Sequence, residues 1–353
     1  MVGVSNAVRQ IVALGPQWPT IDPFLFCAHH DDRYPMGTAN LGPEASLAGR
    51  EIGSDFAGRD GWSMYHGTEV PGFPQHPHRG FETVTLVQRG VIDHSDSLGA
   101  TARFGAGDVQ WLTAGRGIVH CEMFPLINAD KPNPLELFQI WLNLPASDKM
   151  VDPYFTMLWA DKLPVVREVD SNARSATITV VAGELGDADP CPPPPNSWAA
   201  HKDAEVAIWQ ISLDHLATWS LPRTKGTDTV RVLYFFEGID LSIDGQVLSS
   251  GHCAVLATDR DVVLQASATG ASCLVLQGRP IGEPVARYGP FVMNTEEQIR
   301  QAFTDYQRTQ FGGWPWPKDD PTHPRDAERF AKHPDGRVEA PSSPGLYDSP
   351  PTR

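Results

Sequence analysis

Short runs that alternate between apolar and polar residues, separated by glycine, make up most of the stretch between residues 82 and 144. In order they are ETVTLVQ, VIDHSDS, GDVQWLTA, IVHCEMF and LELFQIWLNL. They are rich in β-branched and aromatic residues, which favour strands over helices. Each run and the turn after it take roughly ten residues, a spacing typical of all-β sandwiches and barrels. We therefore predict such a β-domain here.

The second half of the chain carries a similar set of runs. They are VAIWQISL, RVLYFFEG, VLSSGHCAVLAT, DVVLQAS and SCLVLQG, spread over residues 206–278. RVLYFFEG ends at Gly238 much as TVTLVQRG ends at Gly90, and GHCAVLAT then matches GDVQWLTA in pattern. The proline-rich segment DADPCPPPP lies between the two halves and predicts a stiff surface loop. We interpret the similarity as a duplication of one β-domain.

A helical pattern is found only near the C-terminus, in NTEEQIRQAFTDYQRTQ (294–310). Thr295 and Gln298 have the spacing of a capping box, and an apolar stripe follows them. The stripe consists of Ile299, Phe303 and Tyr306. The sequence then becomes polar and rich in proline. We predict a largely irregular tail over residues 318–353, with a short helical piece around 326–333.

Composition and charge narrow the class of protein. Apolar residues make up 41% of the chain and charged residues 20%, which indicates a globular protein. The formal charge of −15 argues against direct nucleic-acid binding and would suit a basic partner surface. The N-terminus lacks an apolar run long enough for a signal peptide or a membrane span. The five cysteines are scattered and never spaced C-x-x-C, so we expect a reducing, cytoplasmic environment.

Two pairs of metal-ligand type residues stand two positions apart. His76 and His78 flank a proline in HPHRGFE, and His120 and Glu122 occur in GIVHCEMF. Residues i and i+2 of a strand point to the same face, so each pair presents both side chains together. The four side chains offer three imidazoles and one carboxylate, a set that suits iron, manganese, nickel, copper or zinc. The pattern predicts a site for a divalent transition metal with coordination positions left open, as in catalytic sites.

Each pair alone has a simpler interpretation. A lone H-x-H is more often a pair of surface histidines, and the metal hypothesis depends on both pairs occurring in the same β-domain. Strand parity adds Glu82, because positions 76 to 82 share a face in an unbroken strand. Glu82 could be a fifth ligand, a general base or a partner to a ligand histidine. Of the other histidines, we expect His66 to lie near the cavity and His94 to be a turn residue.

The longer motifs resemble those of one known family. HPHRGFETVT, GDVQWLTAGRGIVHCEMF, GPFVMNTEEQI, DYQ and FGGWPW are similar to the signatures of pirins, a branch of the cupin superfamily. The resemblance covers residues 22–317. It implies two tandem cupin barrels of the jelly-roll type, with iron(II) as the usual metal. It also places the metal ligands on His76, His78, His120 and Glu122.

The resemblance suggests how the chain is divided. We expect a metal-binding barrel at 1–165, a second barrel at 166–290, the helix and FGGWPW segment at 291–317, and the tail at 318–353.

The second barrel can be compared with the first directly. Aligning Gly238 with Gly90 puts Thr224 and Gly226 where His76 and His78 stand. Aligning Gly251 with Gly107 puts Leu264 and Ala266 at the positions of His120 and Glu122. None of these four residues offers an imidazole or a carboxylate, so we expect the second barrel to lack a metal.

Two functions are compatible with the resemblance. Some pirins resemble quercetin 2,3-dioxygenases, which open a flavonol ring with dioxygen, and Glu122 or Glu82 would then act as the base toward a small phenolic substrate. The alternative is a non-enzymatic, iron-dependent redox sensor that binds a transcription factor or a metabolic enzyme as its protein partner. The long loop at 29–65 and the tail depart from shorter pirins.

Overall fold

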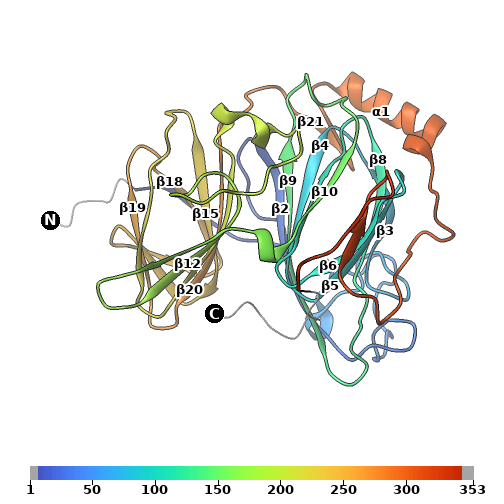
Figure 1. The fold of residues 1–353 in the computed structure, drawn as a ribbon, viewed down its shortest axis with the longest axis horizontal. Coiled ribbons are helices and arrows are strands. Elements are labelled where there is room, and N and C mark those ends of the chain that lie inside the picture. Colours follow the sequence, from blue (N-terminus) through green and yellow to red (C-terminus); the bar gives the residue numbers. More distant parts are fainter. Residues whose placement is uncertain (1–6, 344–353) are drawn as a thin grey trace. The chain divides into compact units, whose positions relative to one another are not determined.

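The computed structural model describes residues 7–343, and most of its regular structure is β-strand (Figure 1). In this part of the chain there is one α-helix, α1 (Glu296–Thr309). The side chain of Thr295 accepts a hydrogen bond from the Gln298 amide, and the Gln298 side chain accepts one from the Thr295 amide. The predicted capping box is thus present, and the prediction of an all-β fold with a short C-terminal helix is confirmed.

The chain forms two compact units. Unit 1 contains the residues up to Ala28 together with Lys162–Gly282, and unit 2 contains His29–Asp161 together with the residues from Glu283 onward. These limits differ from the expected divisions at 165 and 290. The N-terminal strand β1 (Val8–Ala13) belongs to unit 1 because it pairs with β18 (His252–Leu256). No helix among residues 7–343 is long and apolar enough to cross a membrane.

Unit 2 is built from two sheets. One has the strand order β10 (Tyr154–Leu158), β7 (Val109–Thr113), β4 (Phe81–Arg89), β9 (Asn133–Asn143), β2 (Phe24–Tyr34). The other has the order β24 (Val338–Glu339), β23 (Phe330–Lys332), β6 (Thr101–Gly105), β5 (Val91–Asp96), β8 (Ile118–Met123), β3 (Gly72–His78). A small hairpin of β21 (Ala286–Tyr288) and β22 (Phe291–Met293) packs with α1. Side chains from both sheets, among them Ile92, Phe104, Leu112 and Leu137, form one buried core.

Unit 1 repeats this plan with two sheets of its own. The larger has the order β1, β18, β15 (Val230–Gly238), β20 (Ala271–Gly278), β13 (Ala207–Leu213), β12 (Ser175–Ala182), β11 (Val165–Val169). The smaller has the order β14 (Thr218–Leu221), β19 (Val262–Ala266), β16 (Asp240–Ile243), β17 (Gln246–Ser249). Its core is apolar and includes Trp209, Trp219, Leu233 and Leu264.

Short 3-10 helices occur in the connections of both units. They are η1 (Arg59–Gly61), η2 (Ala160–Lys162), η3 (Trp198–Ala200), η4 (Lys202–Ala204) and η5 (Gln310–Gly312).

The C-terminal segment packs against unit 2 and is not the irregular tail that we predicted. Strand β23 pairs with β6, and it occupies part of the stretch where a helical piece was predicted. The reason lies outside the segment. Buried Arg103 on β6 binds the Asp93 carboxylate and also donates to the carbonyl oxygens of His323 and Pro324, at 3.1 and 2.7 Å. A buried guanidinium needs such acceptors, and the segment supplies them. Residues 344–353 lie outside the described part.

The long loop before β3 is held in place by a buried polar cluster. Asp32 accepts hydrogen bonds from the Tyr65 hydroxyl at 2.7 Å and from the Ser63 amide at 2.9 Å. His30 Nδ1 lies 2.7 Å from the same hydroxyl. Burial raises the pKa of Asp32 to about 6. The loop end is therefore fixed to β2, close in sequence to the H-P-H motif.

Candidate metal centre

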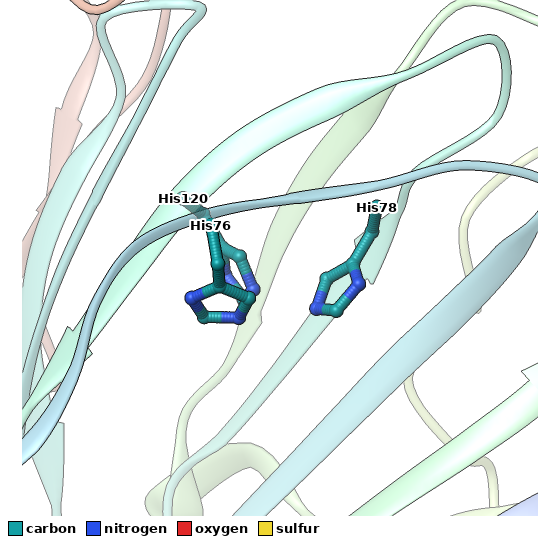
Figure 2. Close-up of side chains that lie close together, drawn as sticks. All are labelled: His76, His78 and His120. Atoms are coloured by element: carbon teal, nitrogen blue, oxygen red, sulfur yellow. The ribbon is translucent and has the colours of Figure 1, made fainter. Parts of the chain in front are cut away.

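Three histidines from two neighbouring strands of unit 2 form a compact cluster (Figure 2). Strands β3 and β8 are antiparallel, and their register places His76 directly opposite His120. His78 lies two residues further along β3, on the same face as His76. One nitrogen from each of His76, His78 and His120 lies within 4.8 Å of the others. The sequence pairs are thus brought together as predicted, and the three side chains could hold a divalent metal.

The protonation of these imidazoles suits metal binding. Nδ1 of His76 donates to the Pro74 carbonyl oxygen at 2.8 Å, which leaves Nε2 with a free lone pair. Nδ1 of His78 is 3.4 Å from the Pro290 carbonyl oxygen. Burial lowers the pKa of His76 to about 4 and keeps the pKa values of His78 and His120 well below their usual range. All three rings are therefore neutral at physiological pH, the form that binds a metal.

His120 provides the strongest indication that the residues fit a metal. It is completely buried, and neither Nδ1 nor Nε2 has a hydrogen-bond partner among the described residues. Leaving a buried polar group unpaired is unfavourable by about 1–3 kcal/mol. A metal ion at the centre of the cluster would give this ring a partner. Three imidazole donors suit several divalent transition metals and do not by themselves select one.

Glu122 lies beside the triad but is already engaged by other side chains. Its carboxylate accepts hydrogen bonds from Thr85 Oγ1 at 2.9 Å and from Gln139 Nε2 at 2.8 Å. Burial raises the pKa of Glu122, and His94, Thr85 and Gln139 partly offset that effect. A carboxylate held by two hydrogen bonds keeps lone pairs for a metal or a proton. Its role as the fourth ligand stays a prediction.

Glu82 does not point toward the triad. Strand β3 ends at His78 and β4 begins at Phe81, with Gly80 between them at a φ of 85°. A Cβ on Gly80 would lie 1.9 Å from the Val292 carbonyl oxygen, so the turn requires glycine. This break cancels the parity argument. Glu82 lies on the face of β4 opposite to Thr85, and its carboxylate accepts a hydrogen bond from Thr113 Oγ1 at 2.7 Å.

The sequence analysis missed His94 and Asp96, which lie beside the triad on β5. The register of β5 and β8 places His94 opposite Glu122 and Asp96 opposite His120. The two side chains are buried, and His94 Nε2 lies 3.3 Å from Asp96 Oδ2. The ring of His94 stacks on Phe155 and lies 5.6 Å from that of His120. His94 is thus a strand residue facing the site, and the same i, i+2 spacing in VIDHSDS would have revealed it.

Two partly exposed aromatic residues flank the triad. The Trp141 ring lies 5.4 Å from that of His78, and the Phe73 ring lies 6.3 Å from that of His76. His66 belongs to the Phe73 side, with its ring 5.7 Å from the Phe73 ring. The other histidines of this unit have separate partners, since His29 pairs with Glu136 and His30 with Tyr65.

Unit 1 has apolar residues at the positions that correspond to the triad. Strands β14 and β19 pair as β3 and β8 do, with Trp219 opposite Leu264 and Leu221 opposite Val262. Trp219 and Leu221 therefore correspond to His76 and His78. Our alignment was wrong in choosing Thr224 and Gly226, because the connection between β14 and β15 is longer than the one between β3 and β4.

Comparison with known proteins agrees with this architecture. Residues 5–142 match the pirin family model, and residues 208–312 match the model of the pirin C-terminal cupin domain. A Pseudomonas aeruginosa protein provisionally named a quercetin 2,3-dioxygenase is 38% identical over 68% of this chain and 79% of its own length. A pirin-like protein of Caulobacter vibrioides is 35% identical over 76% and 90%.

A solved structure supports the same assignment. The crystal structure of quercetin 2,3-dioxygenase from Acinetobacter baumannii has a TM-score of 0.65 and 25% sequence identity, and the match covers 87% of this chain and 96% of that one. The two family models, the relatives and the paired barrels lead to one conclusion: the chain belongs to the pirin family.

Proposed function

We propose that this protein is a mononuclear metal-dependent dioxygenase that acts on quercetin-like flavonols or related phenols, with iron(II) as the metal. The observation that carries the proposal is the triad of buried, neutral imidazoles with a hydrogen-bonded carboxylate beside it. Two similar proteins whose names refer to quercetin 2,3-dioxygenase support the choice of substrate class. In this proposal His76, His78, His120 and Glu122 hold the metal.

The chain's own residues would prepare the substrate for reaction. When bound, the metal supplies Lewis acidity that lowers the pKa of a phenolic hydroxyl, together with a redox centre for dioxygen. Trp141 and Phe73 flank the triad and offer aromatic faces between which a planar phenol can be oriented. Burial raises the pKa of the Glu122 carboxyl, which favours its taking a proton from the substrate hydroxyl.

Thr85 and Gln139 would keep the Glu122 carboxylate in position. Thr85 Oγ1 lies 2.9 Å from Glu122 Oε1 and also 2.9 Å from Gln139 Oε1, so its one proton can serve only one of them at a time. Gln139 Nε2 holds the other carboxylate oxygen. Protonation of Glu122 can therefore be accompanied by a shift of the Thr85 hydroxyl toward Gln139. The carboxylate is oriented throughout by at least one donor.

The substitution Glu122→Gln tests the proposal. It preserves the shape of the side chain and allows hydrogen bonds to Thr85 and Gln139 to be remade. We expect quercetin-dependent oxygen uptake to fall by about 100-fold, the scale of general-base catalysis, while elemental analysis still finds metal. Glu82→Gln is the matched control, since Glu82 is buried on the other face of β4, and it should leave turnover unchanged.

Two outcomes would contradict the proposal. Unchanged turnover in Glu122→Gln would remove the proton-transfer role of this residue. Bound metal without oxygen uptake on quercetin or any catechol-like phenol would instead support the alternative, an iron-dependent sensor that binds a protein partner.

A further inference from the structure

Unit 1 contains a cavity of about 620 Å³ at the end of its barrel. It is lined by residues of β13, β15 and β20 and by the connections at 182–206 and 222–229. A volume of several hundred Å³ is typical of sites for small organic molecules. The cavity does not hold the counterpart of the histidine triad, because those positions are filled by core side chains such as Trp219 and Leu264. It therefore needs a separate explanation.

A buried arginine lies in the wall of this cavity. Arg231 is 1% exposed, and its Nε donates to Gln277 Oε1 at 2.7 Å. Its Nη1 is buried and has no hydrogen-bond partner among residues 7–343. Burial lowers the pKa of Arg231 to about 10, which still leaves the guanidinium charged at physiological pH. A buried cation with an unused N–H group is unfavourable unless an acceptor binds it.

A second unused donor lies close to this guanidinium. Trp209 also lines the cavity, and the Arg231 Cζ atom lies 5.8 Å from the centre of its ring. The indole Nε1 of Trp209 is buried without a hydrogen-bond partner among the described residues. Indole nitrogen can only donate. Both unpartnered groups therefore call for the same kind of ligand, one that accepts hydrogen bonds.

The acidic residues near Arg231 do not provide that acceptor. Glu205 and Asp261 attract the guanidinium, but the Glu205 carboxylate is engaged elsewhere. It accepts hydrogen bonds from the amides of Lys225 and Gly226, at 2.8 and 2.9 Å, and from the Thr229 hydroxyl. Lys225 in turn pairs with Glu184 at the cavity rim. The charge of Arg231 thus remains available to a molecule in the cavity.

The remaining walls suggest the rest of the ligand. Pro190, Pro192 and Pro193, from the proline-rich segment, line the cavity together with Pro222 and the Trp209 ring. These surfaces offer apolar contacts and no charge. The planar guanidinium fork matches the geometry of a carboxylate. We propose that unit 1 binds a small organic carboxylate, with its charged group on Arg231 and Trp209 Nε1 and its apolar body against the prolines.

Calorimetric titration of the metal-loaded full chain with benzoate tests this inference. We expect millimolar or tighter binding of benzoate, at least about tenfold weaker binding of the uncharged isostere benzamide, and a similar loss in Arg231→Gln. Arg223→Gln is the matched control, because Arg223 is an exposed residue of the same cavity and removes the same charge. It should change benzoate affinity by less than about twofold.

Further arms keep the result unambiguous. Benzoate binding should persist in His120→Gln, which separates this site from the metal centre. Trp209→Phe keeps an aromatic ring and deletes only the N–H donor, so it tests the site if Arg231→Gln does not fold, and it should weaken benzoate by about threefold or more. The proposal is overturned if benzoate does not bind, if it binds Arg231→Gln as tightly as the natural chain, or if inorganic phosphate binds more tightly than benzoate.

Discussion

The two units use the same strand pairing to surround very different interiors. In unit 2 the facing positions of β3 and β8 carry His76, His78, His120 and Glu122, with His94 opposite on β5. In unit 1 the corresponding strands β14, β19 and β16 carry apolar residues that belong to one continuous core. They are Trp219, Leu221, Leu264, Ala266 and Leu241. The pairing pattern therefore does not require the polar cluster.

The energetic consequence separates the two interiors. Burying a leucine-sized side chain stabilises a fold by about 1.5–3 kcal/mol, which unit 1 gains at these positions. Unit 2 instead buries imidazoles and a carboxylate, and an unpaired imidazole nitrogen such as those of His120 is unfavourable. A cluster that weakens the fold when it is empty is best explained by what it binds. The difference between the units therefore supports a metal centre in unit 2 alone.

The largest effect should come from removing one triad ligand. His120→Gln deletes an imidazole whose two nitrogens have no other partner among the described residues. We expect metal affinity, measured by competition with a chelator, to fall by about 1,000-fold or more, because substitutions of outer partners alone cost about 10–100-fold. Leu264→Met, at the corresponding position of unit 1, should not change it. Equal affinity in both variants would remove the distinction between the two interiors.

The next effect concerns the C-terminal segment, which packs on unit 2. Arg103→Met leaves Asp93 buried without its guanidinium and removes the donors to His323 and Pro324. We expect unit 2 to lose about 3 kcal/mol of unfolding free energy, the scale for breaking a buried ion pair. Urea unfolding followed by hydrogen exchange would resolve the two units. Ser249→Ala alters the corresponding, exposed position of unit 1 and should have little effect. Equal losses in both units would contradict the account.

A smaller effect should follow when unit 2 is made more like unit 1 at His94. His94→Leu introduces the residue type found at the corresponding position, Leu241. We expect about a tenfold loss of quercetin turnover with metal retained. His94 lowers the pKa of Glu122, so its removal should raise that pKa. Because a base acts when deprotonated, the acid limb of the pH–rate profile should move to higher pH. An unmoved limb would show that His94 does not act through Glu122.

Local spacing was enough to predict the triad. Residues two apart on a strand share a face whatever the rest of the chain does, so H-P-H and H-C-E could be interpreted without knowing the fold. The same rule applied to VIDHSDS would have found His94 and Asp96. The strand content, the duplication and the capping box of α1 likewise depend on local patterns.

The features that could not be predicted depend on distant contacts. Glu82 was misplaced because Gly80 breaks the strand, and that break is required by the Val292 carbonyl oxygen, far along the chain. The C-terminal segment forms β23 because Arg103 attracts its carbonyl groups. The correspondence of Trp219 to His76 depends on the length of the connection after β14, which an alignment without gaps cannot take into account.

The central claim is that a metal binds in unit 2 and not at the corresponding place in unit 1. Crystals of the purified protein, measured at the absorption edge of the metal found by elemental analysis, test it directly. We predict an anomalous difference peak about 2 Å from one nitrogen each of His76, His78 and His120, and no peak beside Trp219 and Leu264. Metal-free protein, or a peak elsewhere with none at the triad, would contradict the account.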